Sequence, residues 1–557
     1  MVVLCWSLMN KKIILFLTLI MVIASGLRLW QLGKVPSSPD WDEVALGYNA
    51  YSILETGKDE YGKFLPIVLR SFDDYKPALY TYLAIPSVVV LGLNVVAVRL
   101  PSAIFGILTI LATFFLVKEL FKKNSLALLA SFLLAISPWH IQFSRVAFEA
   151  NVGVALNTFG ILFFLKAFKK PWFLSLSALM LGFSLHVYQS EKVFVPLLIT
   201  ILIYAFRKEF FLIKKKYIYA SLIIFAVICL PLILFTLTNK DALSRAKTVS
   251  IFSNSSIIEA NTEKLVKDRV NNDILGLILD NRRVEFAKYI VGGYLSHLDL
   301  NWLFVKGDIA RHHAPGMGLM YLIELPFLLI GIYMLIFGKF DKALKIFITL
   351  WFLIVPIPAS VTNDVPHAVR TINFLPILQI FTAIGILTAF SKVSSIKHKI
   401  LSIKIKYLFF LLILLASTFN FSYYLNQYFI QQNYFHARYW QYGYKDMVNF
   451  VASIQKDYSK IIVSNTATMD QSYMFFLFYL KYDPNKYLSE GGTLTGKIES
   501  VNKFSNFEFR KFDYSQEKEK NILLIGSTFD FQEVYKTIHE ANYPDKSIAI
   551  KAVEKNK

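Results

Sequence analysis

Carboxylates, a lysine and aromatic side chains are concentrated in one stretch near the start of the chain. The carboxylates are Asp40, Asp42, Glu43, Asp73 and Asp74, and Lys76 stands before Pro77. The aromatic residues among them are Trp41, Tyr48, Tyr51, Tyr61, Phe72, Tyr75 and Tyr80. Because acid groups are costly to remove from water, such a cluster in an apolar chain indicates a functional site. A carboxylate there can act as a general base toward a hydroxyl, or bind a metal.

The composition identifies the class of protein that must position these residues. Of 557 residues, 55% are hydrophobic and only 18% are charged, against about 25% charged residues in soluble proteins. We therefore expect an integral membrane protein. The net charge of +20 is explained by basic cytoplasmic loops, so no nucleic-acid partner is predicted. Two cysteines, Cys5 and Cys229, provide neither a disulfide framework nor a thiolate metal site.

Long apolar runs predict the transmembrane helices, since a spanning helix needs about 17–25 apolar residues. The runs are 13–32, 98–120, 124–142, 150–166, 171–189, 193–206, 217–238, 317–337, 343–360, 368–390 and 407–425. We predict about eleven spans, and up to thirteen, with the first one uncleaved. The run 79–93 is short and contains Pro86, so we expect it to be interfacial or re-entrant.

The distribution of Lys and Arg predicts the orientation in the membrane. The loops 118–123, 166–170, 207–216, 339–345 and 392–406 each carry three or more basic residues, whereas 143–149, 190–192 and 361–367 carry one, one and none. By the positive-inside rule the basic loops and the N-terminus are cytoplasmic. The first outer loop 33–97, the long outer loop 239–316 and the C-terminus are then extracytoplasmic.

With this topology the polar candidates fall on the outer face. They are Asp42, Glu43, Lys76, Arg99, Arg145, Glu149, Glu191, Arg311, His312, His313, Asp364, His367 and Arg370. Eleven spans could have scattered these groups over both faces, so their co-location is the main argument for an active site there.

The charged residues of the first outer loop can also be explained without a function in catalysis or binding. Asp42 and Glu43 could stabilise a helix N-terminus near Gly47–Leu54. Lys76 could reach toward lipid headgroups, or it could neutralise a phosphate. Arg99 could be a membrane anchor at the end of its span.

The later candidates have alternatives as well. Glu149 could pair with Arg145, which would contribute little at a surface. The pair His312 and His313, next to Arg311, together with His367 and Arg370, suits a phosphate or a sugar. Adjacent histidines lack the i,i+4 spacing of a helical zinc site.

The outer segments carry secondary structure of their own. In the long outer loop we predict helices near Ser255–Arg269 and Asp273–Tyr294. We predict a transmembrane domain over residues 1–430 and a small extracytoplasmic α/β domain over residues 431–557. Within this α/β domain, strands are expected at Lys460–Ser464 and Asn521–Ile525, and helices at Gly443–Gln455, Gln471–Tyr482 and Phe531–Glu540.

Several short motifs together carry a family resemblance. They are Trp41-Asp42-Glu43, Asp74-Tyr75-Lys76-Pro77, Val98-Arg99-Leu100-Pro101-Ser102, and Ser144-Arg145 with Glu149. The series resembles the first half of the GT-C fold glycosyltransferases, in particular the bacterial branch related to dolichyl-phosphate-mannose protein mannosyltransferases and lipid A aminoarabinose transferases. Pro366-His367-Ala368-Val369-Arg370 is similar to a His-Pro-Arg-Tyr-like element of bacterial members. The resemblance covers residues 13–430 in topology and is specific over residues 40–150.

The resemblance implies a GT-C glycosyltransferase in a bacterial inner membrane. Its donor would be one sugar, a hexose or a pentose, on a polyprenyl phosphate, transferred with inversion to an extracytoplasmic glycan, lipid or protein. The family's first-loop acid falls on Asp42, with Glu43 beside it, and would be the base. The donor phosphate would be bound by Lys76, Arg99 and Arg370. Substrate-binding candidates are Tyr75, Glu149, Arg311, His312, His313 and His367.

Other readings of the sequence remain open. Glu149 stands where relatives carry Asp, and Tyr75-Lys76-Pro77 replaces the His-Pro-Pro of the classical protein mannosyltransferases. A lipid-linked glycan polymerase or ligase is one alternative, and a transporter or flippase of an amphiphilic solute is another. No cofactor is certain, and a divalent metal at Asp42, Glu43 and Glu149 is left open.

Overall fold

The computed structural model describes residues 10–239, 247–394, 399–496, 500–517, 521–531 and 535–555. The chain divides into two compact units. Unit 1 comprises residues 1–27, 105–142 and 149–424, and unit 2 comprises residues 28–104, 143–148 and 425–557. The N-terminal residues 1–9, predicted to be cytoplasmic, lie outside the described residues.

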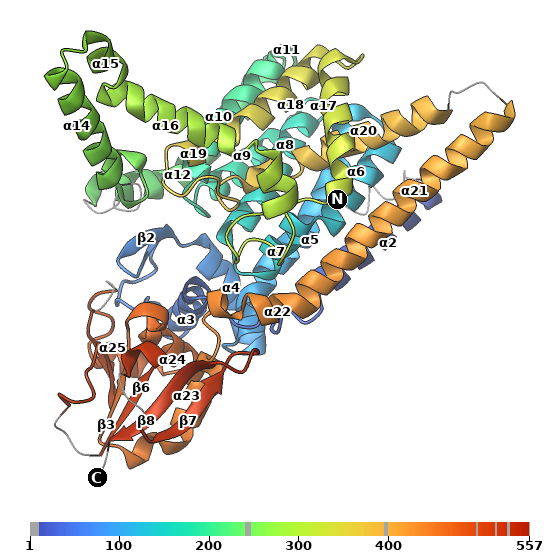
Figure 1. Cartoon of the computed structure of the whole chain (residues 1–557). Coiled ribbons are helices and arrows are strands. Elements are labelled where there is room, and N and C mark those ends of the chain that lie inside the picture. Colours follow the sequence, from blue (N-terminus) through green and yellow to red (C-terminus); the bar gives the residue numbers. More distant parts are fainter. Residues whose placement is uncertain are drawn as a thin grey trace. The chain divides into compact units, whose positions relative to one another are not determined.

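Unit 1 is built from apolar helices (Figure 1). Its helices, of which α2, α5, α7 and α21 extend into unit 2, are α2 (Lys11–Leu29), α5 (Val95–Phe121), α6 (Asn124–Ile136), α7 (Pro138–Arg145), α8 (Glu149–Ala167), α9 (Phe173–Ser184), α10 (Glu191–Ala205), α11 (Arg207–Phe210), α12 (Lys215–Thr238), α17 (Leu325–Phe337), α18 (Lys342–Ile354), α19 (Ile357–Ser360), α20 (Ile377–Ser394) and α21 (Lys399–Asn426). Each predicted apolar run contains at least one of them.

Seven helices of the described chain are long and apolar enough to cross a membrane, or eight if α6 and α7, bent by 57°, count as one span. The chain is therefore a multi-pass membrane protein. The predicted number of eleven spans is not confirmed, because helices such as α9 are short. Helix α4 (Leu79–Leu91) has 13 residues. At 1.5 Å per residue it covers about 20 Å, less than the hydrocarbon core, as expected for residues 79–93.

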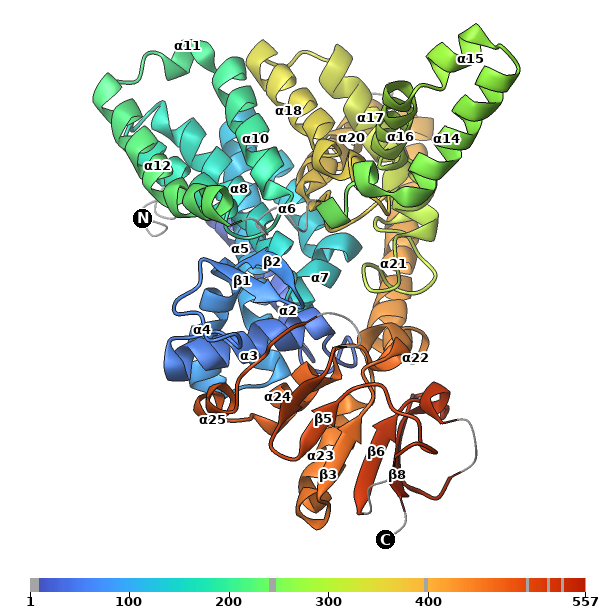
Figure 2. The same cartoon turned by 90° about the vertical axis from the view of Figure 1, so that its left-hand side faces the viewer.

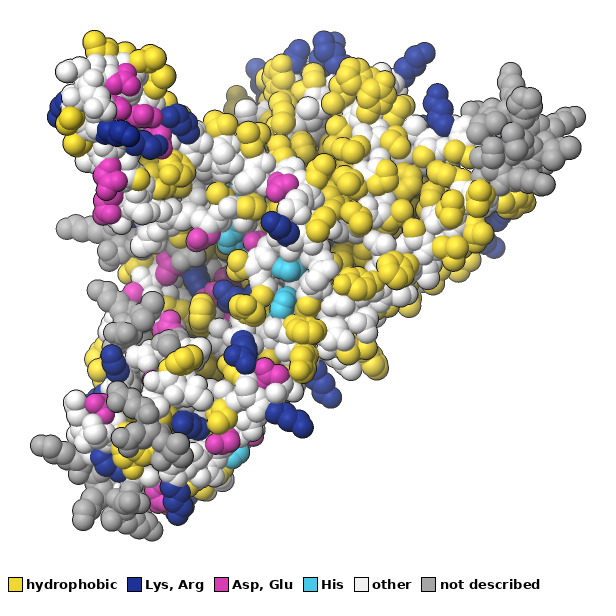
Figure 3. Space-filling model, viewed as in Figure 1, with side chains coloured by type: hydrophobic (Ala, Val, Ile, Leu, Met, Phe, Trp, Pro, Cys, Tyr) yellow, Lys and Arg dark blue, Asp and Glu magenta, His cyan; other side chains and the backbone are white. Residues whose placement is uncertain are grey.

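Unit 1 separates apolar faces from basic loops. Hydrophobic side chains cover α17 and α21, and Lys and Arg gather at the edge where α11 lies (Figure 3). Two contacts join the basic loops. Glu119 accepts a hydrogen bond from Lys169 at 2.7 Å, and the Phe121 and Phe340 rings lie 5.7 Å apart. The loops 118–123, 166–170 and 339–345 therefore lie on one side, as the sequence predicts.

The described part of the long outer loop includes the α-helices α14 (Ser255–Val270), α15 (Ile274–Leu279) and α16 (Arg282–Ser296). The first predicted helix is confirmed. The second is wrong as one continuous helix, because Asn281 interrupts it. The Asn281 side chain accepts hydrogen bonds from the backbone N–H groups of Arg283 and Val284, so it caps a new helix.

Unit 2 combines the first outer loop with the C-terminal region. The first loop forms α3 (Trp41–Thr56), a hairpin of β1 (Val68–Ser71) and β2 (Asp74–Pro77), and α4. The C-terminal region contains α22 (Gln432–Phe435), α23 (Tyr444–Ile454), α24 (Ser472–Leu480) and α25 (Pro484–Ser489). Within this unit α3 packs against α24 and α25 (Figure 2).

The C-terminal sheet has the order β4-β5-β3-β6-β8-β7. Its strands are β3 (Lys460–Val463), β4 (Asn502–Phe504), β5 (Phe507–Phe509), β6 (Ile522–Gly526), β7 (Thr537–Asn542) and β8 (Ile548–Lys555). Strand β3 runs parallel to β5 and β6, and the remaining pairs are antiparallel. The predicted strands at 460 and 521 and the helices at 443 and 471 are confirmed. The predicted helix Phe531–Glu540 is wrong: residues 537–542 pair with β8, and residues 532–534 lie outside the described part.

Candidate active site

A tight hairpin in unit 2 presents Lys76. Strands β1 and β2 pair with Leu69 opposite Lys76 and Arg70 opposite Tyr75. The two turn residues, Phe72 and Asp73, have φ values of 51° and 59°, the left-handed backbone of a two-residue hairpin turn. The Asp73 carboxylate accepts hydrogen bonds from Arg70 at 2.8 Å and from Thr495 at 2.7 Å. The turn is thus held both by its own strand and by the C-terminal region.

The first turn of α3 presents Asp42 to Lys76. Asp40 is the N-cap: its side chain accepts the Glu43 N–H at 2.9 Å, and the Glu43 carboxylate accepts the Asp40 N–H at 3.3 Å. This capping box confirms the alternative of a helix N-terminus for this acidic stretch. It leaves Asp42 in the open first turn, where its carboxylate forms an ion pair with the Lys76 ammonium. The Asp42 side chain is 40% exposed and that of Lys76 is 19% exposed.

Glu43 lies beneath this surface and pairs with Arg99 of α5. The Arg99 Nε and Nη2 groups donate to the two Glu43 oxygens at 2.8 Å each, and the side chains are 0% and 2% exposed. Arg99 also donates to the carbonyls of Leu32, Pro36 and Ser38 at 3.0, 3.0 and 2.9 Å. All five guanidinium N–H groups of Arg99 are therefore used within the protein.

Hydrogen bonds from two further residues complete this buried network. The Ala147 N–H donates to Glu43 Oε1 at 2.9 Å. Arg145 donates to the carbonyls of Arg28, Gln31 and Val35 at 3.1, 3.2 and 3.0 Å. The two arginines thus fix the backbone of residues 28–38, which leads into the Asp40 cap.

The C-terminal region closes the far end of α3 through Glu60. The Glu60 carboxylate is fully buried and accepts hydrogen bonds from Asn49, Tyr473 and Thr493 at 3.1, 3.2 and 2.8 Å. Burial raises the pKa of Glu60 to about 7, although these hydrogen bonds oppose the shift. First loop and C-terminal region therefore share a titratable, buried contact.

A second cluster of polar residues lies in unit 1. Asp308 accepts a hydrogen bond from His312 Nδ1 at 2.9 Å and another from the Ala368 N–H at 2.5 Å. The His312 and His367 rings lie 5.1 Å apart. Hydrogen bonds from His312 and its charge, together with the neighbouring His367, outweigh burial and lower the pKa of Asp308 to about 2. Burial lowers the pKa of both histidines.

Arg370 borders this cluster. Its Nη1 group donates to Thr362 Oγ1 and to the Asn363 carbonyl at 2.6 Å each. Among the described residues, its Nε and Nη2 groups have no hydrogen-bond partner. Arg370 therefore keeps donors for an anion, which Arg99 does not.

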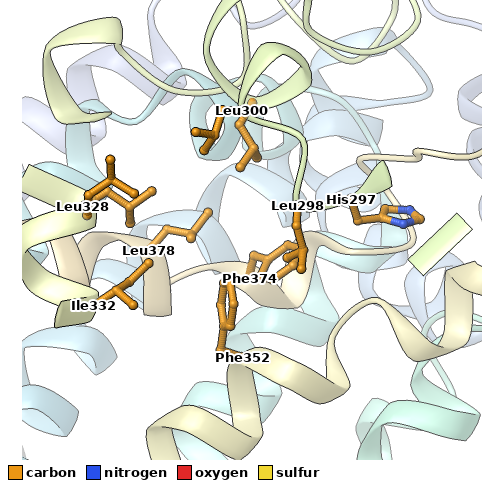
Figure 4. Close-up of a pocket in the computed structure, with 10 residues that line it drawn as sticks. His297, Leu298, Leu300, Leu328, Ile332, Phe352, Phe374 and Leu378 are labelled. Carbon is orange, nitrogen blue, oxygen red and sulfur yellow. The ribbon is translucent and has the colours of Figure 1, made fainter. Parts of the chain in front are cut away.

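An apolar cavity of about 110 Å³ adjoins His297 in unit 1 (Figure 4). It is lined by His297, Leu298, Leu300, Leu303, Leu328, Leu329, Ile332, Phe352, Phe374 and Leu378. His297 Nδ1 donates to the Gly293 carbonyl at 2.6 Å and its Nε2 accepts the His367 N–H at 3.1 Å. Burial lowers the pKa of His297 to about 4, so the ring is neutral. The cavity is somewhat smaller than one of about 150 Å³ that holds benzene.

The structure distributes the predicted site residues over both units. Unit 2 holds Asp42, Glu43, Tyr75, Lys76 and Arg99, whereas unit 1 holds Glu149, Arg311, His312, His313, His367 and Arg370. In unit 1, His312, His367 and Arg370 are brought together around Asp308. Glu149 is buried at the start of α8, and His313 Nδ1 donates to the Ala314 carbonyl at 2.8 Å. The roles predicted for all these residues stay predictions.

The sequence analysis missed Asp308, His297 and Glu60. Asp308 and His312 have the i,i+4 spacing that brings two side chains together on a helical turn. This spacing was overlooked because attention went to the adjacent pair His312 and His313. Nothing in the sequence singled out Glu60, because its burial depends on residues more than 400 positions later.

Comparisons with known proteins agree with this fold. The family model of the dolichyl-phosphate-mannose-protein mannosyltransferases matches residues 18–243. No curated protein matches the chain by sequence. The structure of ArnT from Cupriavidus metallidurans bound to undecaprenyl phosphate superposes with a TM-score of 0.54 and 10% identity, over 97% of this chain and 98% of that one.

A second group of similar structures is archaeal. The oligosaccharyltransferase AglB from Archaeoglobus fulgidus, in complex with an inhibitory peptide and a dolichol-phosphate, superposes with a TM-score of 0.51 and 13% identity over 84% of this chain. The present chain spans only 63% of AglB. The chain therefore has the GT-C fold of these structures, and over residues 18–243 it is similar to the mannosyltransferase family.

Proposed function

We propose that this protein transfers a single sugar, a hexose or a pentose, from a polyprenyl-phosphate-linked donor to an extracytoplasmic acceptor, with inversion at the anomeric carbon. The acceptor is a hydroxyl of a glycan, a lipid or a protein. Asp42 is the general base and Lys76 binds the donor phosphate. Support for a lipid-phosphate donor comes from the fold, since the similar ArnT structure is bound to undecaprenyl phosphate and that of AglB is in complex with a dolichol-phosphate.

The different surroundings of the two adjacent acids carry this proposal. Glu43 is 2% exposed and bound by both the Arg99 guanidinium and the Ala147 N–H, so a substrate cannot reach it. Asp42 is 40% exposed and is paired with an ammonium group. We therefore assign the base to Asp42 and treat Glu43 and Arg99 as positioning residues that hold the first turn of α3.

The ion pair between Lys76 and Asp42 suggests how donor binding prepares the base. The donor phosphate is an anionic diester and competes with the Asp42 carboxylate for the Lys76 ammonium. As Lys76 turns to the donor, Asp42 becomes available to accept a hydrogen bond from the acceptor hydroxyl. Asp42 then takes the proton of this hydroxyl while its oxygen attacks the anomeric carbon, and the lipid phosphate leaves with its charge balanced by Lys76.

The orientation belongs to the same proposal. The basic loops that lie together at the α11 side face the cytoplasm of a bacterial inner membrane, and the first outer loop and the C-terminal region face outward. The apolar cavity beside His297 is a candidate for an apolar part of the donor. In unit 1, Arg370 retains the donors that a phosphate needs.

Transfer is tested with protein reconstituted in lipid vesicles and given radiolabelled polyprenyl-phosphate sugars, one hexose and one pentose at a time, with membrane extracts as acceptor. The proposal predicts release of polyprenyl phosphate together with a labelled product of inverted anomeric configuration. Labelled donor that crosses the vesicle membrane unchanged, without any product, would identify a flippase and contradict the proposal. Products that carry several linked sugars from one donor would favour a polymerase or ligase.

A further inference from the structure

Three residues of unit 1 meet from two separate loops. Asp308 and His312 come from the end of the long outer loop, and His367 comes from the turn that precedes α20. One potential ligand atom from each lies within 4.8 Å of the other two. Gly307, with a φ of +72°, allows the backbone to turn just before Asp308.

The hydrogen bonding of these residues is incomplete at one atom. The Nδ1 atom of His367 is buried and has no hydrogen-bond partner within the described part of the chain. The neighbouring His297 differs, because both of its ring nitrogens are used. A buried polar atom without a partner costs free energy, so an unpaired imidazole nitrogen on a residue of this cluster points to a ligand.

We propose that Asp308, His312 and His367 form a binding site for a transition-metal dication of the zinc type. The site belongs to unit 1, whereas Asp42 and Glu43 belong to unit 2, and it does not rest on the proposed transfer reaction. Two imidazoles and one carboxylate are a ligand set typical of zinc and related first-row metals, whereas Mg²⁺ and Ca²⁺ prefer oxygen ligands. Three protein ligands leave a fourth position open for water or an anion.

The geometry requires only a modest adjustment. Metal–nitrogen bonds of about 2.0–2.1 Å join ligand atoms at most about 4.2 Å apart, so a small rotation of the imidazole rings closes the site. The pair Asp308 Oδ2 and His312 Nδ1 is already 2.9 Å apart, and the metal would replace the proton that they share. The Ala368 N–H, donating to the same Asp308 oxygen at 2.5 Å, holds the carboxylate in place.

Charges of both signs surround the site. Asp308 supplies a negative charge, whereas the cations Arg370, near His367, and Arg311, near His312, oppose a metal. The metal would connect the long outer loop to the 361–367 turn, which the hydrogen bond from the Ala368 N–H to the Asp308 carboxylate already joins. We therefore expect the metal to stabilise this junction.

The test uses full-length protein without a histidine tag, in lipid nanodiscs, freed of metal and titrated with Zn²⁺ against a chromophoric chelator. We expect one tightly bound zinc ion. The variants Asp308→Ala and His367→Ala should each bind at least about tenfold more weakly. His313→Ala, which removes the adjacent histidine, is the matched control and should bind like the unmodified protein. Equal affinity in Asp308→Ala and His367→Ala, or no zinc bound by the unmodified protein, overturns the proposal.

A measurement on the unmodified protein keeps the test decisive if a variant fails to fold. X-ray absorption spectra of the zinc-loaded protein should show scattering from two imidazole rings and no sulfur ligand. Spectra without imidazole scattering would contradict the site. The melting temperature should also rise with added Zn²⁺ but not with Mg²⁺, because Mg²⁺ demands oxygen ligands.

Discussion

The Arg99 guanidinium and the Glu43 carboxylate form a two-point ion pair, with both hydrogen bonds at 2.8 Å and neither side chain more than 2% exposed. It links the start of α5 to the first turn of α3. Two residues that the motif series suggested for chemistry thus hold the frame on which their neighbour Asp42 is presented. Motif residues in this loop divide into those that build the turn and those that a substrate can reach.

Breaking this pair should destabilise the protein. Glu43→Ala leaves a buried arginine without its anion, and we expect a loss of about 3–5 kcal/mol in the free energy of unfolding. The thermal melting of purified protein in detergent measures this loss as a lower transition temperature. Glu55→Ala, which removes an exposed acid of the same helix, is the control and should melt like the unmodified protein. Equal melting of Glu43→Ala and Glu55→Ala would contradict a structural role for the pair.

The contact around Glu60 should depend on pH. The folded-state pKa of Glu60 is raised from 4.5 to about 7, so the folded state binds a proton more tightly than the unfolded state. The stabilisation is fully present below pH 4.5 and is lost as the pH rises through 7. The raised pKa corresponds to about 3 kcal/mol at most. Hydrogen exchange at residues 59–62 and 493–496 should therefore be faster at pH 8 than at pH 6, after correction for the intrinsic rate.

A substitution separates this effect from other titrations. Glu60→Gln keeps the shape and the hydrogen-bonding capacity but cannot ionise, so its corrected exchange should not change between pH 6 and pH 8. Glu55→Gln should keep the pH dependence of the unmodified protein. A pH dependence that survives in Glu60→Gln would show that another group is responsible.

Removal of the Lys76 ammonium should weaken donor binding. A hydrogen bond to a charged group contributes about 1.5–3 kcal/mol, so Lys76→Ala should raise the KM for the lipid-linked donor about 10- to 100-fold. Steady-state kinetics with varied donor concentration measure this change. Lys58→Ala, at an exposed position of the same loop, should leave the KM unchanged. A normal KM in Lys76→Ala would remove Lys76 from the donor site.

The sequence predicted the frame of the fold because periodicity and composition are local signals. Apolar runs located the membrane helices, and α4 was correctly separated from them by its length. The chain from 531 to 540 has a helical pattern, yet Thr537–Asn542 is a strand because it pairs with β8, a partner that local pattern does not reveal. The number of membrane spans could not be predicted from the sequence either. The length of a helix as short as α9 does not determine whether it crosses the membrane.

The candidate site was predicted in part. Charge clustering and motif order singled out Asp42, Glu43, Lys76 and Arg99. They did not predict that Glu43 pairs with Arg99 or that Asp42 pairs with Lys76. Those pairings depend on the capping box at Asp40 and on the hairpin turn at Phe72–Asp73. Asp308 escaped notice because its partners come from separate loops, and pairing across loops leaves no periodic signal.

The central claim is that Asp42 removes the proton of the acceptor hydroxyl. Single-turnover transfer from a radiolabelled polyprenyl-phosphate sugar, measured in nanodiscs alongside equilibrium donor binding, tests it most directly. Asp42→Asn should lower the transfer rate by about 10²- to 10⁴-fold while the Kd for the donor stays within a few-fold of the unmodified value. Asp40→Asn, which keeps the helix cap with a side chain that caps equally well, should transfer at close to the normal rate. Normal transfer by Asp42→Asn would contradict the account.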